Sequence, residues 1–248
     1  MGLGRSETRQ EIAQACGRLH LSQNPVRLCE AEATPVQEEF LHRVFQEELA
    51  HRERLRKTRK FQRAAFPVRK TLEAYEWTSL RLPSTLNRDE LTSCQFVQDK
   101  KNLILYGPVG TGKSHLAIAL GVRACEMEIE TRFFTAASLV TRLSESKRAG
   151  QLERTLKDIA KAELVIIDEW GYLPMNREEA QLLFQVVTAS YEQRSLVITT
   201  NLEFSKWGGI FTDDQMAAAM IDRLAHHGQL IVFEGESYRL KHALMRQR

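Results

Sequence analysis

The sequence predicts an α/β protein in which a small all-helical domain precedes a parallel sheet of five strands. From about residue 100 onward, short apolar segments alternate with longer segments in which apolar residues recur at helical spacing. Strands that alternate with helices form a parallel sheet covered by helices on both faces. Residues before Pro67 show only the helical spacing. We therefore expect right-handed crossovers between the strands and a separate helical domain in front of them.

The N-terminal helical domain is predicted over residues 1–66. It contains two amphipathic patterns, one over residues 7–20 and one over residues 36–63, with apolar residues three or four positions apart. Pro67 interrupts the chain soon after the second pattern. The α/β domain is therefore expected over residues 67–248.

The predicted strands of the α/β domain are short apolar segments bounded by polar residues. They lie at Leu103–Gly107, Arg132–Thr135, Leu164–Asp168, Leu196–Asn201 and Gln229–Phe233. The intervening helices are predicted at residues 113–127, 137–160, 176–193 and 213–226. Gly150 favours a break that divides the second of these segments into two helices.

The composition is that of an ordinary globular protein, with 43% apolar and 27% charged residues. No apolar run reaches the roughly 18 residues that a membrane-spanning helix needs, and the N-terminus lacks the apolar core of a signal peptide. The four cysteines form no CxxC pair, so we expect free thiols rather than a disulfide framework or a zinc site. These features predict a cytoplasmic protein with no membrane partner.

Positive charge is concentrated between residues 51 and 70. This segment holds nine Lys and Arg residues against one acidic residue, Glu53, so its formal charge is +8 in a chain whose net charge is +3. Most of these basic residues share one face of the predicted helix. The residues expected to contact a polyanion are Arg52, Arg56, Lys57, Arg59, Lys60 and Arg63.

The basic helix predicts binding to double-stranded DNA. Its charged face is some 16 Å long at about 1.5 Å per residue, which is enough to follow several phosphates of one strand. Little in the sequence indicates base reading, since there is no zinc finger and no clear recognition helix. We expect largely sequence-independent binding. A solvated charged helix, or a docking site for an acidic protein surface, is the alternative.

A phosphate-binding loop is indicated where the first predicted strand ends. The residues Gly107-Pro108-Val109-Gly110-Thr111-Gly112-Lys113-Ser114 follow an apolar strand and open a helix, which is the context that this motif requires. The glycines let backbone N–H groups turn toward phosphate, and the helix N-terminus adds a favourable dipole. Lys113 is expected to reach the β- and γ-phosphates, and Ser114 to bind Mg²⁺. The loop therefore predicts ATP and Mg²⁺ as cofactors.

Two carboxylates follow the apolar strand that begins at Leu164. Ligands of open α/β sheets bind at the carboxyl ends of the strands, where Asp168 and Glu169 would lie. Asp168 is expected to hold Mg²⁺ through water. Glu169 is expected to polarise the attacking water as a general base. Without the upstream loop, the same pair would be read as a surface turn.

The next predicted strand ends in a polar amide, Asn201. An amide at this place would lie beside the γ-phosphate and orient the attacking water. The alternative is an asparagine that caps the strand or begins a turn.

The order and spacing of these three elements resemble those of the AAA+ ATPases. Four segments are similar, more narrowly, to the IstB family, the helper ATPases of two-gene insertion sequences, whose nearest relatives are the DnaC-type helicase loaders. These segments are GPVGTGKSHLAIALG at 107–121, LVIIDEWGYLP at 164–174, ITTNLEFSKWGGIF at 198–211 and MIDRLAHHGQLIVFEGESYRLK at 220–241. The resemblance covers about residues 7–248.

The resemblance implies roles that spacing alone does not give. Arg223 matches the arginine finger that reaches the γ-phosphate of a neighbouring subunit, although a helix-terminal arginine that interacts with its own helix is the alternative. His115 belongs to the matched nucleotide-binding segment, and Arg239 is a weaker candidate for a second phosphate-sensing arginine. Only 13 residues follow Gly235, so the lid domain of other AAA+ proteins is expected to be absent or rudimentary.

Three functions remain open at this point. The first is a transposition helper that binds ATP, forms a homo-oligomer, holds target DNA and recruits its cognate transposase, with slow hydrolysis that resets the assembly. Such a protein would be bacterial, cytoplasmic and nucleoid-associated. The second is a DnaC-like loader of a replicative helicase, whose catalytic residues would be the same. The third is a small-molecule kinase, which would need neither Arg223 nor the basic helix.

Overall fold

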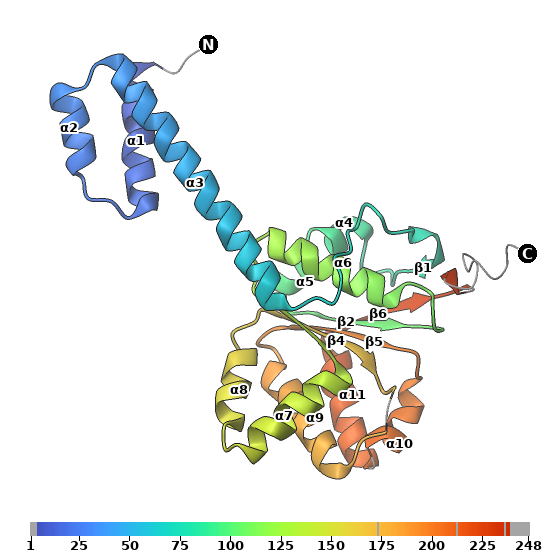
Figure 1. The fold of residues 1–248 in the computed structure, drawn as a ribbon. Helices are drawn as coiled ribbons and strands as arrows, with labels where there is room; N and C mark the ends of the chain where they lie inside the picture. The colour runs from blue at the N-terminus through green and yellow to red at the C-terminus, as the bar shows by residue number, and fades with distance from the viewer. Residues whose placement is uncertain (1–3, 173, 212, 236, 239–248) are drawn as a thin grey trace, which may run out of the picture. The chain divides into compact units, whose positions relative to one another are not determined.

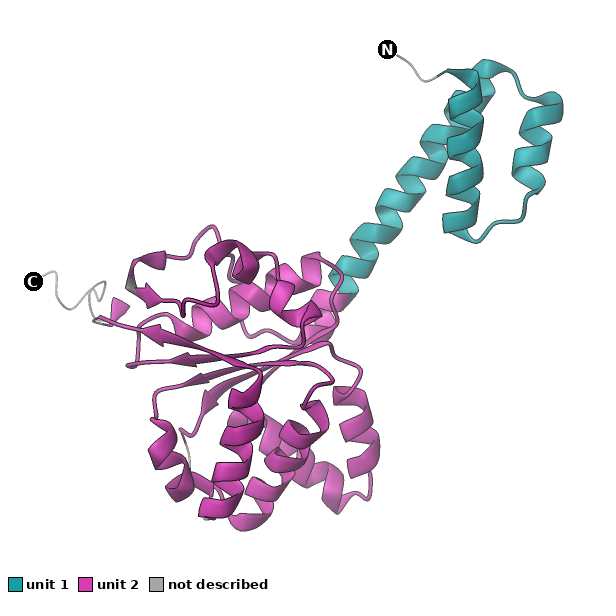
Figure 2. Cartoon of the chain, turned by 180° about the vertical axis from the view of Figure 1, so that it is seen from behind, with its two compact units in different colours: residues 1–59 teal, residues 60–248 magenta. Residues whose placement is uncertain are grey.

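A computed structural model describes residues 4–172, 174–211, 213–235 and 237–238. Contacts within the chain divide it into two compact units, Met1–Arg59 and Lys60–Arg248 (Figure 2). The division falls inside the long helix α3 (Pro35–Ala64), a few residues before residue 66. The predicted domains, 1–66 and 67–248, stay a prediction about which parts of the chain fold independently.

Unit 1 contains α1 (Arg5–Leu19), α2 (Asn24–Glu32) and most of α3. The amphipathic patterns predicted two of these helices, α1 and α3, and both are confirmed. Their apolar contact is small and includes Ala15, Leu19 and Leu49. Apolar spacing does not predict α2, because this nine-residue helix buries only Cys29.

A buried carboxylate joins α1 to the start of α3. The Glu38 side chain is 1% exposed and accepts hydrogen bonds from Arg5 Nε at 3.0 Å and from Arg9 Nη2 at 2.7 Å. Arg5 also donates to the carbonyl oxygen of Ala33 at 2.9 Å. The hydrogen bonds from Arg5 and Arg9 lower the pKa of Glu38 to about 2. The carboxylate therefore stays ionised and paired with two guanidinium groups.

Unit 2 is built on a six-stranded sheet in the order β1-β6-β2-β5-β4-β3. The strands are β1 (Leu80–Arg81), β2 (Asn102–Tyr106), β3 (Thr131–Thr135), β4 (Leu164–Trp170), β5 (Ser195–Thr200) and β6 (Gly228–Phe233). Strands β2 to β6 pair in parallel, which confirms the five predicted strands. The sixth strand, β1, is antiparallel to β6 at the sheet edge. A prediction of five strands alone was therefore incomplete, because two residues are too short to show a strand pattern.

Helices cover both faces of this sheet, as predicted (Figure 1). One face carries α6 (Lys113–Glu126) with the short helices α4 (Arg88–Thr92) and α5 (Gln95–Gln98). The other carries α7 (Ala136–Arg148), α8 (Leu152–Ile159), α9 (Arg177–Ser190), α10 (Trp207–Phe211) and α11 (Asp214–His226). The expected break at Gly150 is confirmed, since this glycine lies between α7 and α8 with φ of 66°. Short 3₁₀ turns at Trp77–Ser79 and Phe204–Lys206 complete the described structure.

Each face of the sheet has its own apolar core. The core under α6 includes Phe96, Leu120 and Phe133. The core under α7, α9 and α11 includes Trp170 and Trp207, which are fully buried with ring centroids 5.5 Å apart. The two cores hold the strands between them, so the carboxyl ends of the strands form a firmly supported edge.

Three further expectations concern the cysteines, membrane-spanning helices and the C-terminal segment. All four cysteines are buried free thiols, as expected from their spacing. Among the described residues, no helix is both long and apolar enough to cross a membrane. Arg239 and the rest of the segment 239–248, where a rudimentary lid would lie, are outside the described residues.

Candidate nucleotide-binding site

The predicted phosphate loop connects β2 to α6. Gly107, Gly110 and Gly112 have φ values of 152°, 84° and 98°, a region that side chains rarely adopt. At Gly107 there is also no room for a side chain, because a Cβ would clash with the carbonyl oxygen of Phe233 in β6. The Gly107 N–H donates to the Thr200 carbonyl oxygen at 3.3 Å. The start of the loop is therefore held between two neighbouring strands.

Lys113 begins α6 and folds back over the loop. Its Nζ donates to the carbonyl oxygens of Gly107 at 2.8 Å and of Pro108 at 2.6 Å. The Thr111 hydroxyl donates to the same Pro108 carbonyl at 2.8 Å. The ammonium group thus lies at the mouth of the loop, next to the N-terminus of α6, where an anion is favoured.

Asp168 lies directly beside this loop, at the carboxyl end of β4. Its Oδ1 accepts a hydrogen bond from Ser114 Oγ at 2.8 Å and a short one from Thr199 Oγ1. The Thr199 hydroxyl in turn accepts from the Glu169 N–H at 3.0 Å. Two strands and the first turn of α6 therefore bring one carboxylate and two hydroxyl groups to one place. Such an all-oxygen set is what Mg²⁺ prefers, so Ser114 and Asp168 fit the metal-binding role expected of them.

Glu169 follows Asp168, but its side chain points to solvent, whereas that of Asp168 is buried. It is exposed, and its φ of 59° is in the left-handed region, where non-glycine residues are strained. Strain of this kind concentrates at functional sites. Glu169 also lines a cavity of about 330 Å³ together with residues of α7, the segment after β4 and α9, including Val140, Tyr172 and Met175. The carboxylate is therefore open to solvent beside the predicted phosphate site.

Asn201 follows β5, the strand that lies between β2 and β4 in the sheet. It is exposed at the same edge as the loop and the Asp168–Glu169 pair. The sheet order alone thus brings the three predicted elements together, although they are up to 94 positions apart in the chain.

Arg223 lies on α11 and is half-buried. Its Nη1 donates to the Ala219 carbonyl oxygen at 2.8 Å, and its guanidinium lies 5.2 Å from the ring centroid of Phe184. These contacts within its own chain hold the side chain along the surface of α11. A role toward another subunit stays a prediction.

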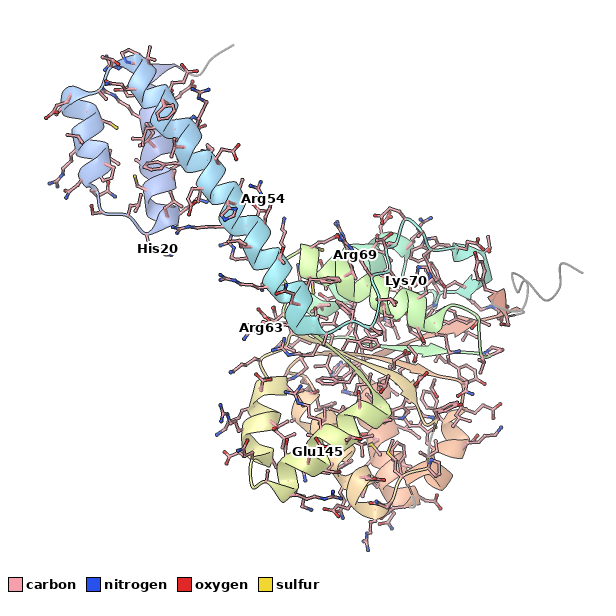
Figure 3. The ribbon with its side chains drawn as sticks, in the orientation of Figure 1. His20, Arg54, Arg63, Arg69, Lys70 and Glu145 are labelled. Carbon is pink, nitrogen blue, oxygen red and sulfur yellow. The ribbon has the colours of Figure 1, made fainter. Side chains whose placement is uncertain are left out.

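The predicted DNA-binding residues occupy the second half of α3 and are already partly paired. Arg52 donates to Glu48 at 2.7 Å, and Lys57 to Glu53 at 2.5 Å. Exposed pairs of this kind contribute little to stability, so phosphate can replace them. Arg56 and Arg59 are also exposed on this helix. Figure 3 shows Arg54 and Arg63 projecting from α3.

The end of the basic helix differs from the part before it. Lys60 donates to the Glu128 carbonyl oxygen and lies 3.3 Å from Glu130, and it is only 19% exposed. Arg63 shares the same carboxylate at 4.0 Å. The uniform basic face expected from the spacing therefore ends at two residues of unit 2, Lys60 and Arg63, that already have an acidic partner within that unit.

Three contributors to the site escaped the sequence analysis. Thr199 is the main one, since only the buried pairing of β4 and β5 shows that its hydroxyl reaches Asp168. Tyr75 is another, because its ring packs against Gly112 and edge-on against His115, with centroids 5.3 Å apart. The Tyr238 N–H also donates to the Gly110 carbonyl oxygen at 3.0 Å. The Thr-Thr pair at the end of an apolar strand was the one signal present in the sequence.

His115, the residue after Ser114, takes part in the aromatic contact with Tyr75. Burial lowers its pKa, and its Nε2 is buried with no hydrogen-bond partner among the described residues. The neighbouring Trp77 Nε1 is also buried without a partner. Buried polar atoms of this kind are uncommon and are satisfied when a polar ligand reaches them.

The chain is similar to ATP-binding proteins of insertion sequences. The family model for IstB-like ATP binding protein matches residues 22–245. A protein of insertion sequence IS21 from Pseudomonas aeruginosa, named as an ATP-binding protein, is 40% identical over 203 residues, which are 82% of this chain and 77% of that protein. A similarly named protein of insertion sequence IS5376 from Geobacillus stearothermophilus is 34% identical over 238 residues, 94% of this chain and 95% of that one.

Two solved structures share the fold of about two thirds of this chain. The DnaC helicase loader superposes with a TM-score of 0.53 at 22% identity, covering 66% of this chain and 96% of that one. The replication initiator DnaA, bound to AMPPCP and single-stranded DNA, gives a TM-score of 0.53 at 18% identity, covering 69% and 52%. At these identities the similarity shows the fold alone, and it confirms the expected α/β architecture.

Proposed function

Because the chain belongs to the family of IstB-like ATP-binding proteins, we propose that it is an ATP-dependent, DNA-binding helper of an insertion-sequence transposase. The proposal combines three parts, which are an ATPase site, an oligomer that completes it and a basic helix that holds DNA. The observation that carries the ATPase part is the meeting of Ser114, Asp168 and Thr199 beside the phosphate loop.

Each residue of the site has a proposed role in ATP hydrolysis. The loop N–H groups and Lys113 hold the phosphates, with Lys113 exchanging its bonds to Gly107 and Pro108 for phosphate oxygens. Ser114 and Asp168 would hold Mg²⁺, which would supply positive charge to offset that of the phosphates. Glu169 accepts a proton from the attacking water, and Asn201 orients that water. The aromatic contact of Tyr75 with His115 offers a surface on which the adenine base of ATP can pack.

ATP acts in this proposal as a switch for DNA binding. Affinity for a DNA duplex is measured by fluorescence anisotropy with ATP, with ADP and without nucleotide. Wild type is expected to bind about tenfold or more tightly with ATP, within the usual range of coupling between sites. Lys113→Ala should lose this dependence, whereas Lys101→Ala, which changes a lysine just before β2 whose side chain is 45% exposed, should keep it. Equal affinity of wild type in all three conditions would rule out the switch.

Arg223 is proposed to act on the ATP of a neighbouring copy. Arg223→Ala should bind ATP normally but hydrolyse it about 1000-fold more slowly, as expected for loss of an arginine finger. Glu169→Gln should also be inactive, but it retains Arg223. If the finger acts between subunits, mixing the two variants restores hydrolysis, because a Glu169→Gln subunit supplies its arginine to an intact Glu169. No recovery on mixing would contradict the shared site.

DNA is proposed to lie along the exposed part of α3. Each phosphate contact adds about one unit to the slope of binding against salt concentration. Arg59→Ala should reduce that slope by about one, and Lys60→Ala should change it less, because Glu128 and Glu130 already engage Lys60. Arg27→Ala, an exposed arginine of α2, is the matched control and should have no effect. If DNA affinity had the same dependence on salt concentration in all three variants, the DNA-binding surface would have to lie outside α3.

A DnaC-like helicase loader is the second candidate, favoured by the shared fold with the DnaC helicase loader. The ATPase site is the same in both, so the partner decides. ATP-dependent co-purification with a transposase, together with a transposase reading frame upstream of this gene, would support the transposition helper. Binding to the replicative helicase of the same cell in place of the transposase would support the loader.

A further inference from the structure

Three potential metal ligands meet at the edge of the sheet opposite to the phosphate loop. Glu192 lies in the turn before β5, His226 ends α11 and His227 precedes β6. One ligand atom from each of the three lies within 4.8 Å of the other two. Over the described parts of the chain, this is the one group of His, Cys and acidic side chains with that spacing. The cluster is at the amino ends of the strands, so it is separate from the nucleotide site.

The spacing within the cluster suits a transition-metal ion. His227 Nε2 and Glu192 Oε1 are 3.1 Å apart. Two ligand atoms that are each about 2.1 Å from a tetrahedral zinc ion stand about 3.4 Å from one another. The rings of His226 and His227 have centroids 4.2 Å apart and an interplanar angle of 70°. Small side-chain rotations therefore suffice to direct all three ligands at one ion.

A buried asparagine fixes the two segments that carry the ligands. Asn102, at the start of β2, is 6% exposed and lies between them. Its N–H donates to the His227 carbonyl oxygen at 2.9 Å, and its Oδ1 accepts from the Leu196 N–H at 2.9 Å. Its Nδ2 also donates to the Leu224 carbonyl oxygen at 3.3 Å. The junction of α11 with β6 and the start of β5 are therefore held together before any ion binds.

Hydrogen bonds also prepare the side chains themselves. The Tyr191 hydroxyl lies 2.9 Å from His226 Nδ1, and such outer contacts orient the imidazole rings that bind metals. The hydrogen bond with His227 lowers the pKa of Glu192, so the carboxylate is ionised, which is the form that binds a cation. Glu192 has a left-handed φ of 58°, and the Gln193 N–H closes its turn onto the Ser190 carbonyl oxygen at 3.0 Å.

We propose that Glu192, His226 and His227 bind Zn²⁺ or a similar transition-metal dication. Two imidazoles and a carboxylate are typical zinc ligands, whereas Mg²⁺ and Ca²⁺ prefer oxygen alone. Ions reach the cluster from solvent, because the side chains of His227 and Glu192 are 39% and 54% exposed. The bound ion would link the end of α11, which carries Arg223 three positions before His226, to the turn before β5. This site is independent of the proposed transposition function.

The test is a calorimetric titration of the full chain with ZnCl₂, without nucleotide or Mg²⁺. Wild type should bind one ion per chain at this site, and the double variant His226→Ala, His227→Ala should lose that binding event. Glu192→Gln should bind at least about tenfold more weakly, since even loss of an outer hydrogen bond costs about 10–100-fold in metal affinity. His51→Ala, which removes an exposed histidine of α3, should bind as wild type does.

Two further measurements make the test decisive. Circular dichroism and ATP binding establish that each variant is folded, and Glu192→Gln serves if the double variant is not. Cobalt(II) substituted for zinc should give a visible absorption spectrum of nitrogen coordination in wild type that Glu192→Gln weakens. Zinc affinity that is unchanged in both variants, or a wild type that binds no better than the double variant, would overturn the proposal.

Discussion

Glu38 in unit 1 and Asp168 in unit 2 are both buried carboxylates, but their partners differ. Glu38 is surrounded by the guanidinium groups of Arg5 and Arg9. Asp168, 7% exposed, has two hydroxyl groups as its partners among the described residues, those of Ser114 and Thr199. A buried charge needs compensation. Glu38 receives it from its own chain, so its role is structural, whereas Asp168 has dipoles alone and is suited to receive a cation.

Neutralising the two carboxylates is therefore expected to have opposite consequences. Asp168→Asn should reduce ATP hydrolysis about 100-fold or more, because an active-site metal contributes several kcal/mol to the transition state and each 1.36 kcal/mol is tenfold in rate. Glu38→Gln, the same chemical change, should leave basal hydrolysis without DNA unchanged. Steady-state phosphate release measures both rates. Comparable losses in the two variants would remove the distinction between them.

The Thr199 hydroxyl should matter less than the carboxylate it contacts. Thr199→Val preserves the shape of the side chain but removes a hydrogen bond to a charged group, worth about 1.5–3 kcal/mol. We expect about tenfold slower hydrolysis and a higher Mg²⁺ requirement, both read from titrations of activity against MgCl₂. Thr199→Ser keeps the hydroxyl and should stay close to wild type. If Thr199→Val hydrolysed ATP as fast as wild type, the hydrogen bond from Thr199 to Asp168 would have no role in hydrolysis.

The smallest expected effect is on the local stability of unit 1. In Glu38→Gln the amides of α1 should exchange hydrogen faster than in wild type, because Arg5 and Arg9 lose their ionic partner. Amides of α6, in unit 2, should be unaffected. Exchange followed by mass spectrometry separates the two helices. Glu39→Gln, at the exposed neighbouring position, is the control and should exchange as wild type does.

The pH dependence of this contact follows from the direction of its pKa shift. The pKa of Glu38 is lowered in the folded chain from 4.5 to about 2. Its contribution to stability is therefore complete above about pH 4.5 and is lost as the pH falls toward 2. Protection of α1 relative to α6 should fall over this range in wild type. Glu38→Gln should lack that part of the acid sensitivity, and an identical acid response would contradict the assignment.

Local pattern predicted much of the nucleotide site. The eight residues from Gly107 to Ser114 must be contiguous to wrap phosphate, so the whole loop appears as one motif in the sequence. Asp168 was found because it ends a continuously apolar strand, and that pattern reflects burial on both faces of a parallel sheet. The predicted helices α1 and α3 likewise follow from apolar spacing that covers several turns.

The features that escaped prediction depend on contacts between distant positions. Strand β1 has two residues and exists only because β6 offers it an edge. Thr199 acts through a hydrogen bond to a residue 31 positions away on the adjacent strand. The +8 segment gave no sign that Lys60 would meet Glu128 and Glu130, which lie in the turn before β3.

The alternation of strands and helices, the phosphate loop and the basic helix can all be predicted from local pattern, because each depends on residues that are neighbours along the chain. Which polar side chains share a site depends on how the strands pack. Parallel pairing places Asp168 and Thr199 at one edge of the sheet, and Glu192 with His226 and His227 at the other. The physical reason is that strand order is set by the packing of both cores, and no local pattern records which strand will lie next to which.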